Sequence, residues 1–415
     1  MRRVVITGLG AVTPIGNNVK ELFDNLKKGK CGIDKITHYD TKGRKVKLAG
    51  EVKDFDPEKY IDKRLVRKTD RFTQFALAAA SEAINDSNIF RDGELQGIEP
   101  DRIGVIVSSG IGGLETIQNE GIRGNEKGYD RISPFFIPMS ISNMAAGQIA
   151  INYGIKGMCS CVVTACAGGT NAIGDAFHYI RDGYADIMVC GGAEASITEL
   201  GIGGFTALKA LSLSEDPLRA SIPFDKERSG FVMGEGAGIL VIEEYEHALA
   251  RNAHIYCEVA GYGANCDANH ITAPLLDGSV AAKCMKKALN DGGISGDKID
   301  YINAHGTSTH LNDVCETNAI RTAFGNHADK LMVSSTKSMT GHLLGASGAV
   351  EGVILALSVN KDFVPPTINY KVKDEECDLF IVPNEGISTK VYYAMSDSLG
   401  FGGHNACIIF KKETM

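Results

Sequence analysis

The residue whose type and setting best suit catalysis is Cys166, which lies among small side chains in residues 163–170. The preceding run is apolar and the following run has helical periodicity, so we expect this cysteine where a strand turns into a helix. The free N–H groups and the dipole of such a helix favour the thiolate, the nucleophilic form. A buried packing cysteine is the alternative, and it is our interpretation of Cys159 and Cys161, which we expect inside the strand.

Two histidines and a lysine follow strand-like runs in the second part of the chain. His305 comes after the apolar run 299–302, and Lys337 and His342 come after the run 331–333. Proteins that alternate strands and helices place functional groups at these carboxyl ends of strands. Because a cysteine takes the equivalent place in the first part, we interpret the four side chains as one group.

Metal and nucleotide sites are not expected. His305 and His310 lack the spacing of helical ligands, and no carboxylate cluster accompanies them. Residues 8–10 contain two glycines after a strand, but Thr13 stands where a dinucleotide-binding fingerprint needs a third. Residues 234–238 are rich in glycine but lack the Lys-Ser/Thr of a phosphate-binding loop.

The elements that position these residues are repeated within the chain. Residues 82–89 echo residues 287–294, and each segment is expected to close a helix shortly before a strand. Residues 6–10 resemble residues 259–263 near the start of each half. Correspondences in the same order along the chain indicate an internal duplication.

A third correspondence, between two apolar stripes at helical spacing, fixes the fold class. One stripe runs through residues 172–180 and the other through residues 349–357. Continuous apolar runs such as Ile187–Cys190 suit strands that are covered on both faces. We therefore predict an α/β protein with two similar halves, residues 1–255 and 256–415, packed into one body.

Composition narrows the function classes. The chain has 415 residues, of which 44% are hydrophobic, and a formal charge of −8 from 43 basic and 51 acidic residues. A net acidic chain has no overall attraction for nucleic acid. Its eleven cysteines are odd in number and contain no CxxC pair, which favours reduced thiols. No signal peptide or membrane span is apparent, so we expect a cytoplasmic protein.

These motifs, together with Ser398–Asn405, resemble those of the elongating β-ketoacyl-[acyl-carrier-protein] synthases of the thiolase superfamily, most closely the type II branch. In the last motif, glycines on both sides of Phe401 free the backbone for close approach or motion. The resemblance covers nearly the whole chain. It implies a thiolase-like fold, two βαβαβαββ halves in a layered α/β/α/β/α body, and usually a homodimer.

The resemblance also implies a reaction, the decarboxylative condensation of an acyl group with malonyl-carrier protein in fatty acid elongation. Cys166 would capture the acyl group from the carrier protein's phosphopantetheine. His305 and His342 would stabilise developing negative charge as neutral hydrogen-bond donors. Lys337 would have a supporting electrostatic role, with Glu351 as its partner. The pantetheine arrives on the carrier protein, so no cofactor of the enzyme's own is implied.

Further roles follow from the same resemblance. The backbone N–H groups of Cys166 and Phe401 would form an oxyanion hole. Thr307 and Thr309 match threonines that hydrogen-bond the pantetheine amides. Phe401 also matches a gating aromatic, and Ile111 matches a residue of the acyl pocket.

A basic cluster could meet an acidic carrier protein. It comprises Lys63, Arg64, Arg67, Lys68 and Arg71. The spacing 64, 67, 68, 71 predicts that four of these side chains share one helical face. A merely solvated face is the alternative, the resemblance favours docking, and Lys209 is a further candidate.

Three residues depart from the family pattern, and none of them is a catalytic group. His310 stands where the family usually has proline, which could alter the entry loop. Asp397 replaces a common asparagine and could change a hydrogen bond or an ion site. Ala273 stands where serine is common near the pantetheine.

Two other functions stay open. A polyketide-type ketosynthase would use the same chemistry on another chain. A non-catalytic partner subunit, like a chain-length factor, would be of a different class, but such subunits typically replace the nucleophile that Cys166 retains.

Overall fold

The computed structural model describes residues 1–413, and its centre is one ten-stranded sheet in the order β12-β11-β15-β16-β10-β1-β9-β8-β6-β7. The strands of this sheet are β1 (Val4–Val12), β6 (Ile103–Ser108), β7 (Cys159–Ser160), β8 (Ile187–Glu194), β9 (Gly236–Glu244), β10 (Cys257–Cys266), β11 (Tyr301–Asn303), β12 (Met332–Ser334), β15 (Tyr393–Gly400) and β16 (His404–Lys411). Three short pairs lie outside it: β2 (Asp34–Lys35) with β3 (Leu48–Ala49), β4 (Phe90–Arg91) with β5 (Glu94–Leu95), and β13 (Phe363–Val364) with β14 (Ile387–Ser388).

The helices alternate with these strands. They are α1 (Val19–Lys27), α2 (Lys63–Val66), α3 (Arg71–Ser87), α4 (Leu114–Lys127), α5 (Phe136–Ser140), α6 (Met144–Tyr153), α7 (Gly168–Arg181), α8 (Glu199–Ala207), α9 (Pro217–Ala220), α10 (Tyr245–Ala250), α11 (Ser279–Asp291), α12 (His310–Phe324), α13 (Lys337–Thr340) and α14 (Ser347–Lys361). Within the described residues, no helix combines the length and the apolar character that crossing a membrane requires.

The predicted duplication is visible in the order of the strands. The antiparallel pair β1–β10 lies at the centre, and outward on either side come an antiparallel strand, β9 or β16, and then β8 or β15. Two parallel strands complete each side, β6 and β7 or β11 and β12. Reading the main elements along the chain gives βαβαβαββ twice, once as β1-α3-β6-α6-β7-α7-β8-β9 and once as β10-α11-β11-α12-β12-α14-β15-β16.

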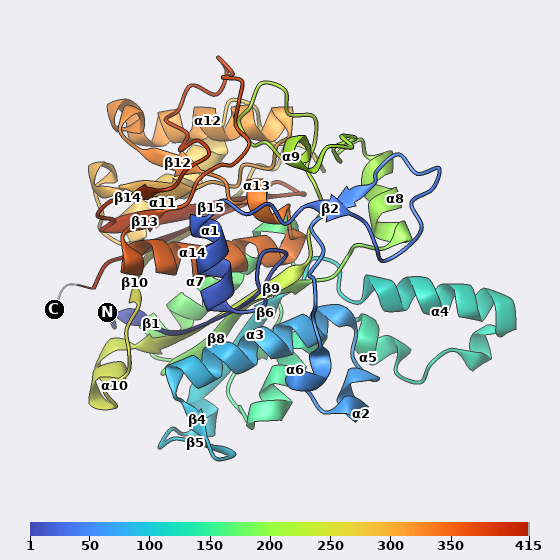
Figure 1. Cartoon of the computed structure of the whole chain (residues 1–415). Coiled ribbons are helices and arrows are strands. Elements are labelled where there is room, and N and C mark those ends of the chain that lie inside the picture. Colours follow the sequence, from blue (N-terminus) through green and yellow to red (C-terminus); the bar gives the residue numbers. More distant parts are fainter. Residues whose placement is uncertain (414–415) are drawn as a thin grey trace.

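The layers follow from which helices contact which strands. Helix α3 packs against β1, β9 and β8, and helix α11 packs against β10 and β16. Between them, α7 and α14 contact each other and strands of both halves. Figure 1 shows these two helices in the middle of the molecule, with α3 and α6 below and α11 and α12 above. The predicted five-layer arrangement is therefore present.

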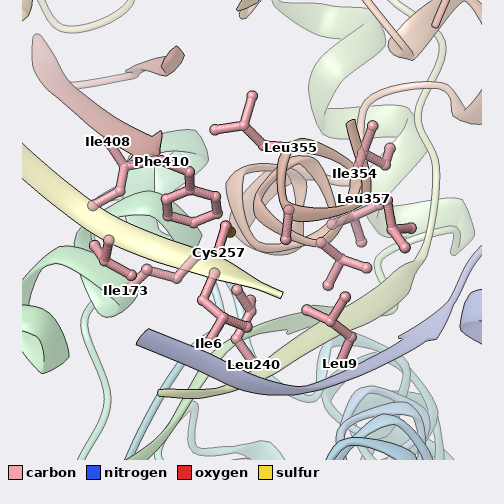
Figure 2. Close-up of a cluster of buried hydrophobic side chains, with 14 of the residues drawn as sticks. Ile6, Leu9, Ile173, Leu240, Cys257, Ile354, Leu355, Leu357, Ile408 and Phe410 are labelled. Atoms are coloured by element: carbon pink, nitrogen blue, oxygen red, sulfur yellow. The ribbon is translucent and has the colours of Figure 1, made fainter. Parts of the chain in front are cut away.

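Alternation along β8 explains why its sequence is apolar throughout. Ile187 and Val189 join the cluster beneath α3, whereas Met188 and Cys190 join the inner cluster around α7 and α14. Successive strand side chains point to opposite faces, and both faces are covered here. Figure 2 shows the inner cluster, where Ile173 of α7 and Ile354 of α14 share a core with strand residues.

Helix α14 differs from the amphipathic helix that its stripe predicted. Residues 347–359 are all buried. Because α14 lies between the two halves of the sheet, residues 347–359 have no solvent-facing side, and a mostly apolar helix is typical of such a place.

The prediction that Cys159 and Cys161 are buried was wrong, and only Cys159 lies in a strand as expected. Strand β7 contains only Cys159–Ser160, Cys159 is exposed, and Cys161 is half-buried. Strand β7 is the last strand of the sheet and pairs only with β6, so its outer edge is left uncovered. Residues 161–163 have left the sheet and lead into the turn that carries Cys166.

Candidate functional site

Cys166 lies in the 3₁₀ turn Ala165–Ala167, directly before the first residue of α7. The turn is tight: Ala165 has a φ of +49°, in the left-handed region. A Cβ on Gly168 would lie 2.1 Å from Ser108 Oγ, and one on Gly169 would lie 2.5 Å from Ala349 N. These glycines let the start of α7 approach β6 and α14, which fixes the thiol at the centre of the molecule.

The expected thiolate is not what the structure favours. Burial raises the pKa of Cys166 to about 12, although the nearby Lys337 charge acts in the opposite direction. Desolvation of the sulfur therefore outweighs the helix N-terminus. In the resting protein Cys166 is a thiol.

His305 follows β11 and is held through its backbone. The N–H groups of His305 and Gly306 donate to the two carboxyl oxygens of Glu316 at 2.6 and 2.7 Å. Glu316 lies on α12 and is fully buried. This contact orients the loop so that the His305 ring faces the same cavity as Cys166.

His342 follows α13 and is held through both backbone and ring. Its N–H donates to the Val232 carbonyl at 2.7 Å, and its carbonyl accepts from Gly234 N at 2.8 Å. Nδ1 lies 2.8 Å from Ser347 Oγ. A hydroxyl proton donated to Nδ1 places the ring proton on Nε2, which turns that nitrogen into a hydrogen-bond donor.

The two histidine rings meet edge to face, with centroids 5.2 Å apart and an interplanar angle of 87°. Burial, together with the Lys337 charge, holds the pKa of both His305 and His342 well below the usual range. Both rings are therefore neutral near pH 7, as expected for hydrogen-bond donors.

Lys337 and Glu351 form the ion pair that the sequence predicted. Lys337 Nζ contacts Glu351 Oε1, and the side chains are only 1% and 3% exposed. A buried lysine without such a partner would be costly. Because the ammonium charge lowers the pKa of Cys166 and of both histidines, it acts on all three reactive groups.

The reactive groups line one cavity of about 530 Å³. Cys166, His305 and His342 lie on it, and so do Thr307, Thr309, Phe401 and Lys209. The two threonine hydroxyls are 2.9 Å apart. The structure thus brings together side chains that are up to 235 positions apart in sequence (Cys166 and Phe401).

Phe401 lines the cavity, whereas Ile111 does not. Gly400 packs so closely that a Cβ would lie 2.7 Å from Thr164 O and 3.3 Å from Cys166 N. The backbone N–H groups of Phe401 and of Cys166 itself both face the sulfur and lower its pKa. Ile111 is not on the cavity wall but packs in the apolar cluster that contains Cys166.

The basic cluster is not arranged as predicted. Lys63 and Arg64 lie on the four-residue helix α2, which ends before α3 begins at Arg71, so no common helical face exists. Arg71 turns inward and pairs with the buried Glu235 at 2.9 Å. Asp70 causes the break, because it caps α3 and accepts a hydrogen bond from Phe72 N. Lys63, Arg64, Arg67 and Lys68 remain exposed.

The departures from the family pattern have distinct environments. His310 and Ala273 both lie on the cavity wall, and His310 Nε2 is 3.2 Å from Glu376. Asp397 is 1% exposed, and neither of its oxygens has a hydrogen-bond partner among the described residues.

Asp397 forms a buried carboxyl pair with Glu316. Burial raises the pKa of Asp397 to about 7 and, with the Asp397 charge, raises that of Glu316 well above its ordinary value. Two buried carboxyl groups this close keep one proton between them. Both oxygens of Glu316 also accept backbone N–H bonds, so the two carboxyl groups titrate as a pair rather than independently.

Sequence reasoning missed Glu316 and Arg228. Arg228 has a fully buried side chain that contacts Asp374 at 2.5 Å and Asp313 at 3.4 Å, and it donates to the Thr309 carbonyl. It therefore supports the loop that carries the two threonines. Neither residue had a local signal, because α12 carries several other polar residues and Arg228 lies outside the helices. Within residues 1–413 no group of three or more His, Cys, Asp or Glu side chains is arranged to hold a metal ion.

Comparison with known proteins agrees with this geometry. Residues 1–248 match the family model "Beta-ketoacyl synthase, N-terminal domain", and residues 256–371 match "Beta-ketoacyl synthase, C-terminal domain". Two curated relatives named 3-oxoacyl-[acyl-carrier-protein] synthase 2 are similar over nearly their whole length. The protein from Synechocystis sp. is 51% identical, and the one from Staphylococcus aureus (strain N315) is 52% identical; in each case 99% of this chain and 98% of the relative are covered.

Solved structures share the whole fold. A β-ketoacyl synthase from Burkholderia phymatum has a TM-score of 0.92 at 32% identity, and all of both chains is covered. A ketosynthase of a type II polyketide synthase, solved with its acyl-carrier protein and a bound hexaketide, has a TM-score of 0.91 at 38% identity, again over both whole chains.

Proposed function

The chain belongs to the β-ketoacyl synthase family, and on that premise we propose that it is an acyltransferase that elongates fatty acids on acyl carrier protein. The reaction joins an enzyme-bound acyl group to malonyl-carrier protein and gives 3-ketoacyl-carrier protein and CO₂. The observation that carries the proposal is the meeting of Cys166, His305 and His342 on one cavity. A nucleophile and two neutral N–H donors are the groups that this reaction needs.

In the first half-reaction, Cys166 Sγ attacks the thioester carbonyl of the acyl-carrier protein. The backbone N–H groups of Cys166 and Phe401 face the sulfur and are placed to stabilise the tetrahedral oxyanion. The bond from the carbonyl carbon to the pantetheine sulfur breaks, and the thiol proton leaves with that sulfur. The acyl group remains on Cys166.

In the second half-reaction, malonyl-carrier protein occupies the cavity and loses CO₂. The electron pair of the broken C–C bond passes to the thioester enolate, whose oxygen accepts hydrogen bonds from His305 and His342. The enolate carbon attacks the acyl-Cys166 carbonyl, a C–C bond forms, and the C–S bond to the enzyme breaks. The released sulfur takes one proton from solvent, which its high pKa favours.

The proposal includes the partners. An acidic carrier protein would dock beside Lys209 at the cavity and on the exposed basic residues Lys63, Arg64, Arg67 and Lys68. The phosphopantetheine arm would reach Thr307 and Thr309, and the enzyme would need no cofactor of its own.

The proposal also includes the assembly and the compartment. We expect a homodimer, because strand β7 leaves one edge of the sheet unpaired and five large apolar side chains between residues 137 and 163 are exposed. They are Ile137, Ile141, Ile151, Met158 and Val163. We assign the protein to the cytoplasm because all eleven cysteines are free thiols.

The two alternatives are less well supported. The curated fatty acid relatives are 51–52% identical, whereas the polyketide ketosynthase is 38% identical. A non-catalytic partner subunit would not need a reactive centre, and Cys166 and both histidines are retained here.

Mass spectrometry of carrier-protein products tests the proposal. The enzyme is incubated with malonyl-carrier protein and saturated acyl-carrier proteins of increasing length, and Cys166→Ala is the matched control. We expect 3-ketoacyl products two carbons longer than the primer from the wild type and none from the variant. Absence of product while a control synthase is active would favour the partner-subunit function, and product from Cys166→Ala would overturn the assigned nucleophile.

A further inference from the structure

Glu194, the last residue of β8, is a buried carboxyl group that has no part in the mechanism above. Its two oxygens accept five hydrogen bonds. The donors are Gly110 N at 2.8 Å and Gly345 N at 3.0 Å to Oε2, and Ser109 Oγ at 3.1 Å, Ile111 N at 3.2 Å and Ser196 Oγ at 3.3 Å to Oε1. Three donors come from the loop after β6, and one comes from the other half of the chain.

The backbone donors favour a carboxylate over a carboxylic acid. Burial raises the pKa of Glu194, and the three backbone N–H groups act in the opposite direction. A backbone N–H can only donate, so these three groups need an acceptor oxygen, and they stabilise the charged form most strongly. Glu194 therefore acts as the acceptor that holds the segments around it together.

Two of the donors, Ile111 N and Gly345 N, belong to segments that pack in the same apolar cluster as Cys166. Ile111 and Leu344, the residue before Gly345, both pack in the apolar cluster that contains Cys166. Leu344 has a φ of +49°, so its side-chain direction is set by a strained turn of the backbone. One carboxylate thus holds the backbone next to an apolar side chain from each half of the molecule, both in the cluster that contains the nucleophile.

Two glycines make this contact possible. A Cβ on Gly110 would lie 2.9 Å from Glu194 Oε2, and a Cβ on Gly345 would lie 2.8 Å from the same oxygen and 2.3 Å from Gly110 N. The two backbones therefore approach each other as closely as the carboxylate allows. A larger residue at position 345 would have to push Gly110 away, and a larger residue at position 110 would displace the carboxylate.

We propose that Glu194 is a positioning residue that fixes the separation of Ile111 and Leu344 beside Cys166 and thereby selects the length of the acyl chain that the enzyme accepts. The inference rests on the proposed function, because it assumes that the apolar cluster beside Cys166 receives the acyl chain. The spacing of two apolar walls decides which chain fits between them, and small changes in a hydrophobic pocket alter discrimination strongly.

Glu194→Gln is the principal variant. An amide has one acceptor oxygen, and its NH₂ group cannot accept from a backbone N–H. The donors to either Oε1 or Oε2 therefore lose their acceptor. Glu194→Asp keeps the charge but withdraws it by one methylene, and Ser109→Ala removes a single donor. The matched control is Glu82→Gln, since Glu82 is also a glutamate that accepts two backbone bonds, from Ala11 N and Val19 N, but contacts β1 and α1 instead of the site.

The readout is the ratio of kcat/KM for long and short acyl-carrier proteins, with the melting temperature of each variant. We expect Glu194→Gln to change that ratio about tenfold and Glu194→Asp and Ser109→Ala to change it by smaller factors. Glu82→Gln should lower the melting temperature and leave the ratio unchanged. If the folded Glu194 and Ser109 variants keep the wild-type ratio of kcat/KM, the inference is wrong. If Glu194→Gln does not fold, the ratios of Ser109→Ala and Glu194→Asp provide the test.

A second measurement separates this inference from the proposed function. N-alkylmaleimides with short and long chains add to the Cys166 thiol without carrier protein, and peptide mass spectrometry follows Cys166 alone. The ratio of long-chain to short-chain addition rates should change in Glu194→Gln and stay constant in Glu82→Gln. A wild type that makes no 3-ketoacyl product would contradict the proposed function, whereas an unchanged maleimide ratio would contradict only the role of Glu194.

Discussion

At the scale of single residues, nucleophilic attack and the stabilisation of negative charge are assigned to different halves of the chain. The nucleophile comes from the first half and the two histidines from the second. For Cys166→Gln we expect complete loss of condensation but retained decarboxylation of malonyl-carrier protein, because His305 and His342 are held by Glu316, Ser347 and backbone contacts rather than by the thiol. Release of CO₂ and formation of 3-ketoacyl product are measured together. Simultaneous loss of both in a folded variant would contradict an independent role for the histidines.

Asp397 gives a residue-scale prediction about pH. Its pKa is raised from 3.8 to about 7 in the folded chain, so the native state binds a proton that the unfolded state has released between these values. The stabilisation is complete below about pH 4 and is lost as the pH rises through 7. Asp397→Asn is neutral throughout, so its free energy of unfolding relative to wild type should rise by on the order of 2 kcal/mol between pH 5 and pH 8. Urea unfolding at the two pH values measures this, and a constant difference would contradict it.

At the scale of elements, the break between α2 and α3 assigns different tasks to neighbouring arginines. Arg71 is the ion-pair partner of Glu235, which is 1% exposed. Arg71→Ala should therefore cost about 2–4 kcal/mol of unfolding free energy, because it leaves a buried charge unpaired. Arg64→Ala should cost less than about 0.5 kcal/mol and raise the KM for carrier-protein substrates instead. Denaturant unfolding and kinetics on both variants test this, and equal stability losses would contradict it.

The same scale shows what the sequence could predict. Apolar periodicity located β8 and the junction before α7, and the need of a buried lysine for a partner, together with the family resemblance, predicted the pairing of Lys337 with Glu351. The partners of Arg71 and Asp397 could not be predicted, because Glu235 is 164 residues from Arg71 and Asp397 meets Glu316 only through the layering of β15 and α12. The expectation that Cys166 is a thiolate was wrong for a related reason. Its burial comes from several distant segments, whereas the helix dipole is visible locally.

At the scale of the whole molecule, the duplication explains where the site lies. The turn before α7, with Ala165 at a φ of +49°, matches the turn before α14, with Leu344 at +49°. Cys166 in one half corresponds to Gly345 in the other. One copy of the turn therefore supplies the nucleophile, and the other supplies a backbone close enough to bind the carboxylate of Glu194.

The free edge of β7 gives the prediction for the whole assembly. Ile151 on α6 is 73% exposed, and Val163, just after β7, is 55% exposed. Pairing of the two β7 edges would bury both and extend the sheet through a second copy. We expect the wild type to sediment at twice 44.3 kDa and Ile151→Glu/Val163→Glu to sediment at 44.3 kDa.

The matched control is Tyr392→Glu, which places a charge at an exposed large side chain, 48% exposed, in the second half. It should remain a dimer. Because Val163 is three residues from Cys166, separation of the subunits should also loosen the nucleophile turn. Condensing activity should therefore fall in the double variant and persist in the control. A wild type that sediments as a monomer at micromolar concentration, or a double variant that stays dimeric, would contradict this assembly and leave the apolar edge to another partner.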